Sequence, residues 1–108
     1  MKWKVLKSDI HGNGVFASEN VAPNTDLGVA ISLVRETSAQ KLFHRNTFGL
    51  LVNESKKPNA KVVKSGNDWH FVSIKDINKD EEILLDYQDY LDKVELESII
   101  SGKQISVI

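Results

Sequence analysis

Apolar residues occur in short runs along most of this chain, and clusters of turn-forming residues separate the runs. The runs stand at residues 3–6, 15–21, 28–34, 48–52, 60–64, 68–74 and 83–87. Short strands spaced about 8–12 residues apart are typical of an all-β or mostly-β domain. The pattern therefore predicts a mostly-β fold, with a hairpin whose loop is Ser65–Asn67.

Two segments depart from this pattern and favour helix. The segment 37–45 has Thr37 and Ser38 as N-cap candidates. After Tyr90, apolar residues at helical spacing and a lysine four positions before a glutamate are typical of a helix that ends at Gly102. We therefore predict a short helix near 37–45 and another in the C-terminal segment.

The composition bounds the function. The 108 residues correspond to one domain, and 41% hydrophobic with 27% charged residues is ordinary for a globular protein. The absence of cysteine excludes disulfides, thiolate catalysis and Cys-ligated zinc. A net charge of −1 leaves no basic excess for nucleic acid, so we expect no direct nucleic-acid binding. We find neither a membrane span nor a secretion signal, and expect a cytoplasmic protein.

Single motifs carry little chemistry by themselves. Gly12–Gly14 lacks the spacing of a dinucleotide or P-loop motif, so a hairpin turn is the simpler interpretation. The three histidines lie far apart, which argues against a metal site. The acidic residues 80–82 are typical of a solvated turn, and no serine has a nucleophile context. Tyr87 ends an apolar run, where it is either a core residue or a functional phenol.

The order of three motifs is more informative than any one of them. They are GNGVFA at Gly12–Ala17, NESKKPNA at Asn53–Ala60 and EEILLDY at Glu81–Tyr87. In this order, and with these gaps, they resemble the SET domain, the family of S-adenosylmethionine-dependent protein lysine methyltransferases. The resemblance spans about Ser8 to Tyr90. The short chain is similar to the small stand-alone members of viruses and bacteria.

The resemblance implies a fold and a set of site residues. The fold is a β-clip of short curved sheets, with a C-terminal pseudoknot that brings Asn53 and Tyr87 together and a loop shaped by Pro58-Asn59. Tyr87 is then the catalytic tyrosine, and no metal is required. The implied cofactor-binding residues are Gly12, Asn13, Gly14, Val15, Phe16, Asn53 and Glu54, and the implied substrate-channel residues are Phe48 and Tyr90.

The sequence departs from the family pattern at some positions, and these departures leave the role of the C-terminal segment and the function with alternatives. Glu54 stands where the family has histidine, and no aromatic residue follows Tyr90. We therefore divide the chain into a SET-like domain at 1–90 and an apolar C-terminal segment at 91–108, which either closes the site or forms a homodimer contact. The predicted function is methyl transfer to the ε-amine of a protein lysine, in the cytoplasm or in a host cell if the protein is viral. The alternative is a non-catalytic β-clip module that binds a protein partner.

Overall fold

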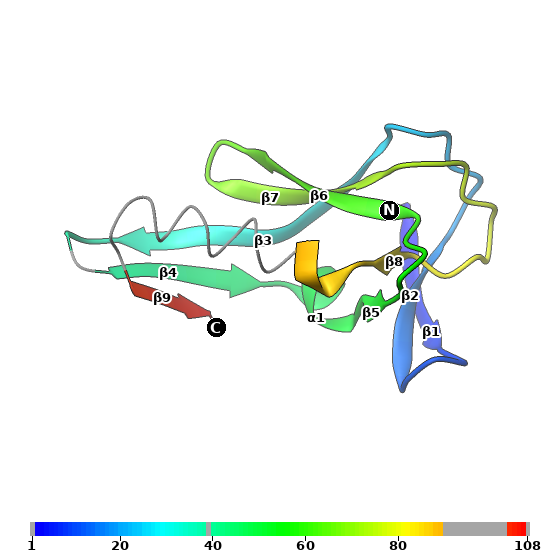
Figure 1. The fold of residues 1–108 in the computed structure, drawn as a ribbon, viewed down its shortest axis with the longest axis horizontal. Helices are drawn as coiled ribbons and strands as arrows, with labels where there is room; N and C mark the ends of the chain where they lie inside the picture. The colour runs from blue at the N-terminus through cyan, green and yellow to red at the C-terminus, as the bar shows by residue number, and fades with distance from the viewer. Residues whose placement is uncertain (1, 39, 90–103, 108) are drawn as a thin grey trace.

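The computed structural model describes residues 2–38, 40–89 and 104–107, which form small sheets around a short helix (Figure 1). These residues form a two-stranded sheet β1–β2, a five-stranded sheet in the order β6-β7-β3-β4-β9, and a two-stranded sheet β5–β8. The mostly-β prediction is confirmed. The elements are β1 (Trp3–Lys7), β2 (Asn13–Ala17), β3 (Asp26–Glu36), β4 (Gln40–Arg45), α1 (Thr47–Leu51), β5 (Asn53–Glu54), β6 (Ala60–Ser65), β7 (Asp68–Ser73), β8 (Leu84–Leu85) and β9 (Gln104–Val107).

The predicted hairpin at Ser65–Asn67 is present between β6 and β7. The two strands pair antiparallel and close at Ser65 opposite Asp68. Gly66 takes a φ of +63°, a conformation that glycine adopts without steric cost. β7 then pairs with β3, so the hairpin forms one side of the five-stranded sheet.

The predictions for residues 37–52 are wrong in both parts. Gln40–Arg45, predicted as helix, is strand β4 and pairs antiparallel with β3. Residues 48–52, predicted as a strand, lie mostly in helix α1. Pairing with the long strand β3 outweighs the weak helical preference of the earlier segment, since tertiary context commonly overrides propensity.

Helix α1 begins after Asn46, whose side chain supports both the helix and the sheet. Its Oδ1 accepts a hydrogen bond from the Gly49 main-chain nitrogen at 3.0 Å, and its Nδ2 donates to the Val29 carbonyl at 2.6 Å. A Cβ on Gly49 would lie 2.2 Å from the carbonyl oxygen of Ala30. Glycine therefore lets α1 approach β3 closely, and the sequence marks this contact only by a capping residue and a glycine.

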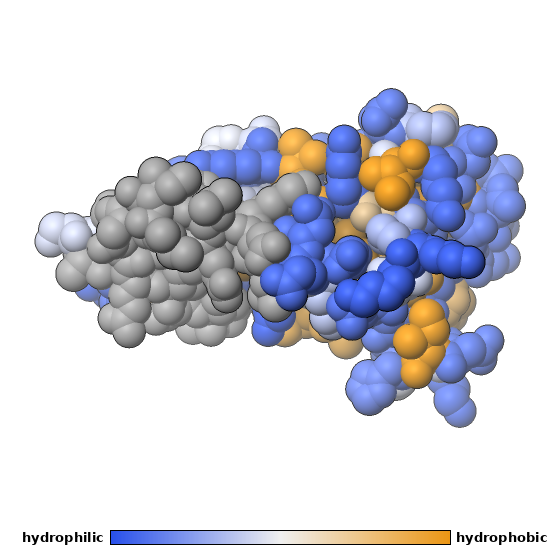
Figure 2. All heavy atoms as spheres, viewed as in Figure 1, coloured by the Kyte–Doolittle hydropathy of each residue, from blue (hydrophilic) through white to orange (hydrophobic). Residues whose placement is uncertain are grey.

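The hydrophobic core lies between the sheets and α1. Phe48 is fully buried, stacks on Trp3 with ring centroids 4.7 Å apart, and meets the edge of Phe71 at the same distance. On the coloured part of the face in Figure 2, hydrophilic side chains predominate and hydrophobic residues form small separate groups. The buried hydrophobic residues are Val15, Ala17, Val21, Leu27, Ala30, Ile31, Phe43, Phe48, Val52, Ala60, Val62, Trp69, Phe71, Ile77, Ile83 and Leu85.

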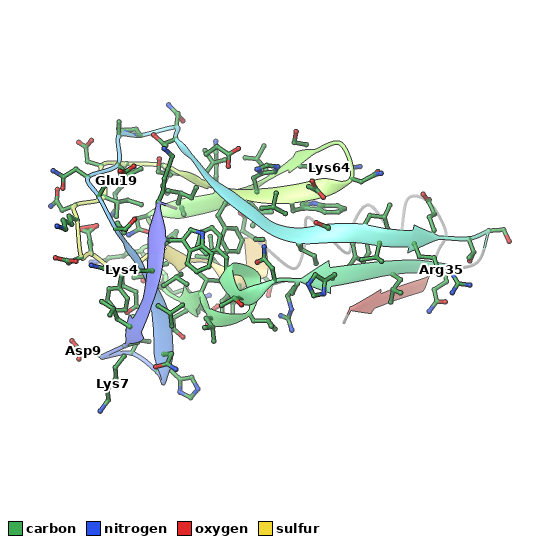
Figure 3. The ribbon with its side chains drawn as sticks, turned by 180° about the vertical axis from the view of Figure 1, so that it is seen from behind. Lys4, Lys7, Asp9, Glu19, Arg35 and Lys64 are labelled. Atoms are coloured by element: carbon green, nitrogen blue, oxygen red, sulfur yellow. The ribbon has the colours of Figure 1, made fainter. Side chains whose placement is uncertain are left out.

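The β1–β2 hairpin and the β3–β4 hairpin project from opposite ends of the molecule. Figure 3 shows Lys7 and Asp9 at the tip of the first hairpin and Arg35 near the end of the second. β9 lies beside β4, in a parallel pair that aligns Gln40 with Gln104. The predicted C-terminal helix falls outside the described residues. Within the described part of the chain, no helix is long and apolar enough to cross a membrane.

Candidate functional site

Three segments that are far apart in the sequence meet at one junction. They are the β1–β2 hairpin, residues 52–59 and residues 82–87, which we call the third segment. Glu82 forms an antiparallel bridge with Phe16 in β2. Two residues later the chain enters β8, which pairs parallel with β5 and aligns Leu84 with Asn53. The segment 82–85 therefore joins the N-terminal hairpin to the region of Asn53. The complete threading of the predicted pseudoknot stays a prediction.

Asn53 connects all three segments through one amide group. The residue is 6% exposed, and its Nδ2 lies 3.1 Å from the carbonyl oxygen of His11, 3.4 Å from that of Asn13 and 2.8 Å from Oε2 of Glu82. A buried amide with such partners holds them in place, because removing the amide or one of its partners leaves buried polar groups without a hydrogen bond. Asn53 therefore holds the Gly12 turn against the third segment.

The two glycines of the predicted turn have different surroundings. Gly12 has a φ of +49°, and a Cβ there would meet nothing within 4 Å, so this turn is open on that side. At Gly14 a Cβ would lie 2.4 Å from Oε2 of Glu82 and 3.1 Å from Nδ2 of Asn53. Gly12 thus serves the backbone conformation, and Gly14 leaves room for two polar side chains.

Ser8 and Glu82 belong to this cluster, although the sequence did not identify them as site residues. The Ser8 hydroxyl donates to Glu82 Oε1 at 2.8 Å and accepts from the Ile10 main-chain nitrogen at 3.0 Å. Glu82 is half-buried, whereas Glu81 beside it is exposed. The interpretation of 80–82 as a solvated turn is therefore wrong for Glu82. No local signal in the sequence marks Glu82, since it lies within a run of three acidic residues.

Tyr87 lies at the end of the third segment, and its hydroxyl donates a hydrogen bond to the Val52 carbonyl oxygen. Burial is the main cause that raises the pKa of Tyr87 above 10.0. The negative charge of Glu54 acts in the same direction, and Arg45 opposes it. The phenol therefore remains protonated at neutral pH. Because its proton is directed at Val52, the lone pairs of its oxygen remain to accept another donor.

Asn59 fixes the path of the third segment. Its Nδ2 donates to the Glu82 carbonyl at 2.8 Å, and its Oδ1 accepts from the Leu84 main-chain nitrogen at 2.8 Å. The side chain is buried, so both main-chain groups depend on it for pairing. Asn59 holds residues 82–84 in place, which fixes where Glu82 and Tyr87 stand.

The structure brings together only part of the predicted site. Among the predicted cofactor residues, Val15 is fully buried in the core, and Glu54 is exposed with its Oε2 3.9 Å from Nζ of Lys56. Phe48 packs between Trp3 and Phe71 and presents no surface here, so its predicted place in a substrate channel has no support. Tyr90 lies outside the described residues. The predicted residues near the three-segment junction are Gly12, Asn13, Gly14, Phe16, Asn53 and Tyr87.

The site consists of main-chain carbonyls, amides, a carboxylate and a phenol. Among the described residues, no group of three or more His, Asp or Glu is arranged to hold a metal ion. Carbonyl and carboxylate oxygens favour positively charged or hydrogen-bond-donating ligands. An open turn with a buried amide behind it is therefore suited to a polar, cationic small molecule.

Comparisons with known proteins agree with this arrangement. The SET domain family matches residues 36–88, a range that contains Asn53, Asn59, Glu82 and Tyr87. No curated protein sequence matches the chain. Among the solved structures 70 chains match. One of them, from Plasmodium falciparum, is described as a "putative histone methyltransferase". It has a TM-score of 0.63 and 25% sequence identity, over 80% of this chain and 92% of that one.

These matches support a methyltransferase fold and confirm the resemblance drawn from the three motifs. The family match covers the second and third motifs. The first motif, at Gly12, lies outside the match but is placed beside Asn53 by the hydrogen bonds of the Asn53 amide. In its three motifs, and in the match over residues 36–88, which is just under half of its length, the chain is similar to the SET-domain family.

Proposed function

We propose that the protein transfers a methyl group from S-adenosylmethionine to the ε-amine of a lysine in a protein substrate. The observation that carries this proposal is the Asn53 amide, which joins the open Gly12 turn to the segment that ends in Tyr87. In a SET domain, these elements are the expected cofactor and catalytic residues. The similarity to the SET-domain family and to the Plasmodium falciparum structure supports methyl transfer in general, and the lysine specificity is our proposal.

The residues at the junction fit the proposed cofactor. The main chain at Gly12 is exposed, and the carbonyl oxygens of His11 and Asn13 lie beside Asn53. These acceptors suit an ammonium group and a sulfonium, both of which are positively charged. The Gly12–Gly14 turn and Asn53 would hold the methionine end. When bound, S-adenosylmethionine supplies an electrophilic methyl group.

Tyr87 is the residue that we propose to orient the substrate amine. Its hydroxyl donates a hydrogen bond to the Val52 carbonyl oxygen, so the lone pairs of the phenol oxygen can accept an N–H of the amine. A lysine amine with a pKa near 10.4 must lose a proton before it acts as a nucleophile, at a cost of about 4 kcal/mol at pH 7.4. Entry into a site beside a cationic group lowers that pKa, so no separate base is needed.

The first test is cofactor binding by the purified protein. Isothermal titration calorimetry with S-adenosylmethionine and S-adenosylhomocysteine should give dissociation constants in the micromolar range or below. A micromolar constant corresponds to a binding free energy of about −8 kcal/mol. Asn53→Ala should weaken this binding and also lower stability by about 1–3 kcal/mol, because partners of the amide are left unpaired. If millimolar ligand produces neither heat nor a thermal shift with the wild type, the proposal is wrong.

One observation favours a second candidate, the non-catalytic module that binds a protein partner. Phe48, predicted to line the lysine channel, is fully buried in the core. A module of this kind keeps the fold without the activity. Transfer of labelled methyl groups to lysine-rich proteins separates the candidates, since a binding module gives a stable complex with its partner and no labelled lysine.

A further inference from the structure

Glu82 is the member of the junction with the most side-chain partners from distant segments. Its carboxylate accepts from Ser8, 74 positions away, and from Asn53, 29 positions away. Its Oε2 also lies close against Gly14, where a Cβ would approach to 2.4 Å. One carboxylate therefore touches both the hairpin that carries the open turn and the amide behind that turn.

The surrounding hydrogen bonds require an acceptor at this place. The Ser8 hydroxyl already accepts from the main-chain nitrogens of Ile10, at 3.0 Å, and of His11, at 3.4 Å. Its single proton is therefore directed to Glu82, with Oε1 at 2.8 Å. Asn53 Nδ2 also points at this carboxylate. An ionised carboxylate accepts all of these donors, whereas a glutamine would turn an NH₂ group toward one of them.

We infer that Glu82 is a positioning residue of the cofactor site. It holds the Asn53 amide and the Ser8–Gly14 turn in one fixed arrangement, and so acts on the cofactor through them. This inference rests on the proposed function as far as the cofactor is concerned. The arrangement of Asn53 by Glu82 is a property of the free protein and can be measured without any ligand.

The effect on binding is tested with Glu82→Ala, Glu82→Gln and the neighbouring control Glu81→Ala. Glu81 is exposed, so its variant should bind S-adenosylhomocysteine like the wild type. Glu82→Ala should weaken binding roughly tenfold or more. The affinity of Glu82→Gln should lie between those of Glu82→Ala and Glu81→Ala, because glutamine keeps the shape of the side chain and one accepting oxygen. Equal affinities for Glu82→Ala and Glu81→Ala would overturn the inference.

A double-mutant cycle separates positioning from a general loss of stability. If Glu82 acts through Asn53, the double variant with Asn53→Ala should bind about as weakly as the weaker single variant. Independent contributions would multiply, and that result contradicts the inference. Titrations are made well below the melting temperature of each variant. If Glu82→Ala does not fold, the cycle is carried out with Glu82→Gln.

The free protein gives the readout that does not depend on cofactor binding. In a ¹H–¹⁵N spectrum, the side-chain amide resonances of Asn53, assigned through Asn53→Asp, should shift in Glu82→Gln and stay in place in Glu81→Ala. Unchanged Asn53 resonances in Glu82→Gln would overturn the positioning role, even if the wild type binds cofactor. If the wild type does not bind cofactor, the proposed function fails, while shifted resonances would still support Glu82 as the group that places Asn53.

Discussion

Gly12 and Gly14 are both glycine, but for different physical reasons. Gly12 needs a left-handed backbone conformation in open space, and Gly14 needs the absence of a side chain beside Glu82 and Asn53. A sequence motif of the form Gly-x-Gly does not separate these two requirements. The structure does, and it predicts different results for the same substitution at the two positions.

Gly14→Ala should therefore be far more harmful to cofactor binding than Gly12→Ala. The alanine at 14 displaces the Glu82 carboxylate and the Asn53 amide, whereas the alanine at 12 only strains the backbone, by about 1 kcal/mol. Calorimetry should show a loss of roughly tenfold or more for Gly14→Ala and a few-fold change for Gly12→Ala. The reverse order would show that the cofactor, if it binds, approaches Gly12 more closely than we propose.

Tyr87→Phe should separate chemistry from binding. The ring remains, but the hydroxyl that accepts from the amine in our proposal is removed. We expect cofactor affinity within a few-fold of the wild type and methyl transfer lower by about 10² or more. Single-turnover rates with saturating cofactor measure this directly, and an unchanged rate would move the role away from Tyr87.

The raised pKa of Tyr87 also predicts a dependence of stability on alkaline pH. Burial favours the neutral phenol in the folded state, so its pKa lies above the unfolded value near 10. This contribution to stability is complete below the unfolded pKa and is lost as the pH rises through the folded pKa. Denaturant unfolding at about pH 8 to about pH 11 should show a smaller alkaline loss for Tyr87→Phe than for the wild type. Parallel curves for the two proteins would exclude a role of Tyr87 in this loss.

Local pattern was sufficient for some elements and not for others. The β6–β7 hairpin follows from two alternating runs around a glycine turn, and all of its determinants lie within a few residues. β4 and α1 do not follow from local pattern, because both are decided by contact with β3. Asn46 and Gly49 were the local signs of α1, but a five-residue helix gives too short a period to detect.

The hydrogen bonds of Asn59 predict that this side chain stabilises the third segment. Asn59→Leu replaces the side-chain amide with an apolar group of similar shape. The Leu84 main-chain nitrogen and the Glu82 carbonyl then lose their partner. We expect a loss of about 2–4 kcal/mol in the free energy of unfolding, from two buried unpaired groups. Asn24→Leu is no suitable control because Asn24 has a positive φ, so exposed Asn67→Ala at the β6–β7 turn serves instead. Equal stability of the two variants would contradict the role of Asn59.

At the scale of the whole molecule, the order of motifs predicted the resemblance to the family and the approach of the Tyr87 region to the Asn53 region, where the Tyr87 hydroxyl reaches the Val52 carbonyl. It did not predict Ser8 or Glu82, since their contact spans 74 positions and neither residue type is unusual where it stands. The predicted channel residue Phe48 is likewise decided by the global fold, which places it in the core. Pairings of this kind depend on how sheets meet, and a single sequence contains no direct record of that.

The last prediction concerns the C-terminal strand β9 and its effect on stability. β9 pairs with β4 along residues 40–43, and Figure 1 shows β9 toward the opposite end of the molecule from β2, β5 and β8. Deleting residues 104–108 should therefore expose the edge of β4, lower the melting temperature by several degrees and increase self-association, because unpaired edges recruit other strands. Cofactor affinity should stay within about twofold of the wild type.

Proline substitutions in β9 provide the matched control for this deletion. Alternate residues of a strand direct their main-chain nitrogens to opposite sides, so one of Ile105→Pro and Ser106→Pro should remove a hydrogen bond to β4 and the other should not. The first should reproduce the loss of melting temperature, and the second should resemble the wild type. Light scattering of the intact protein tests the predicted homodimer directly. If the deletion abolished cofactor binding while the protein stayed folded, the C-terminal segment would be part of the site, either within one chain or across a dimer.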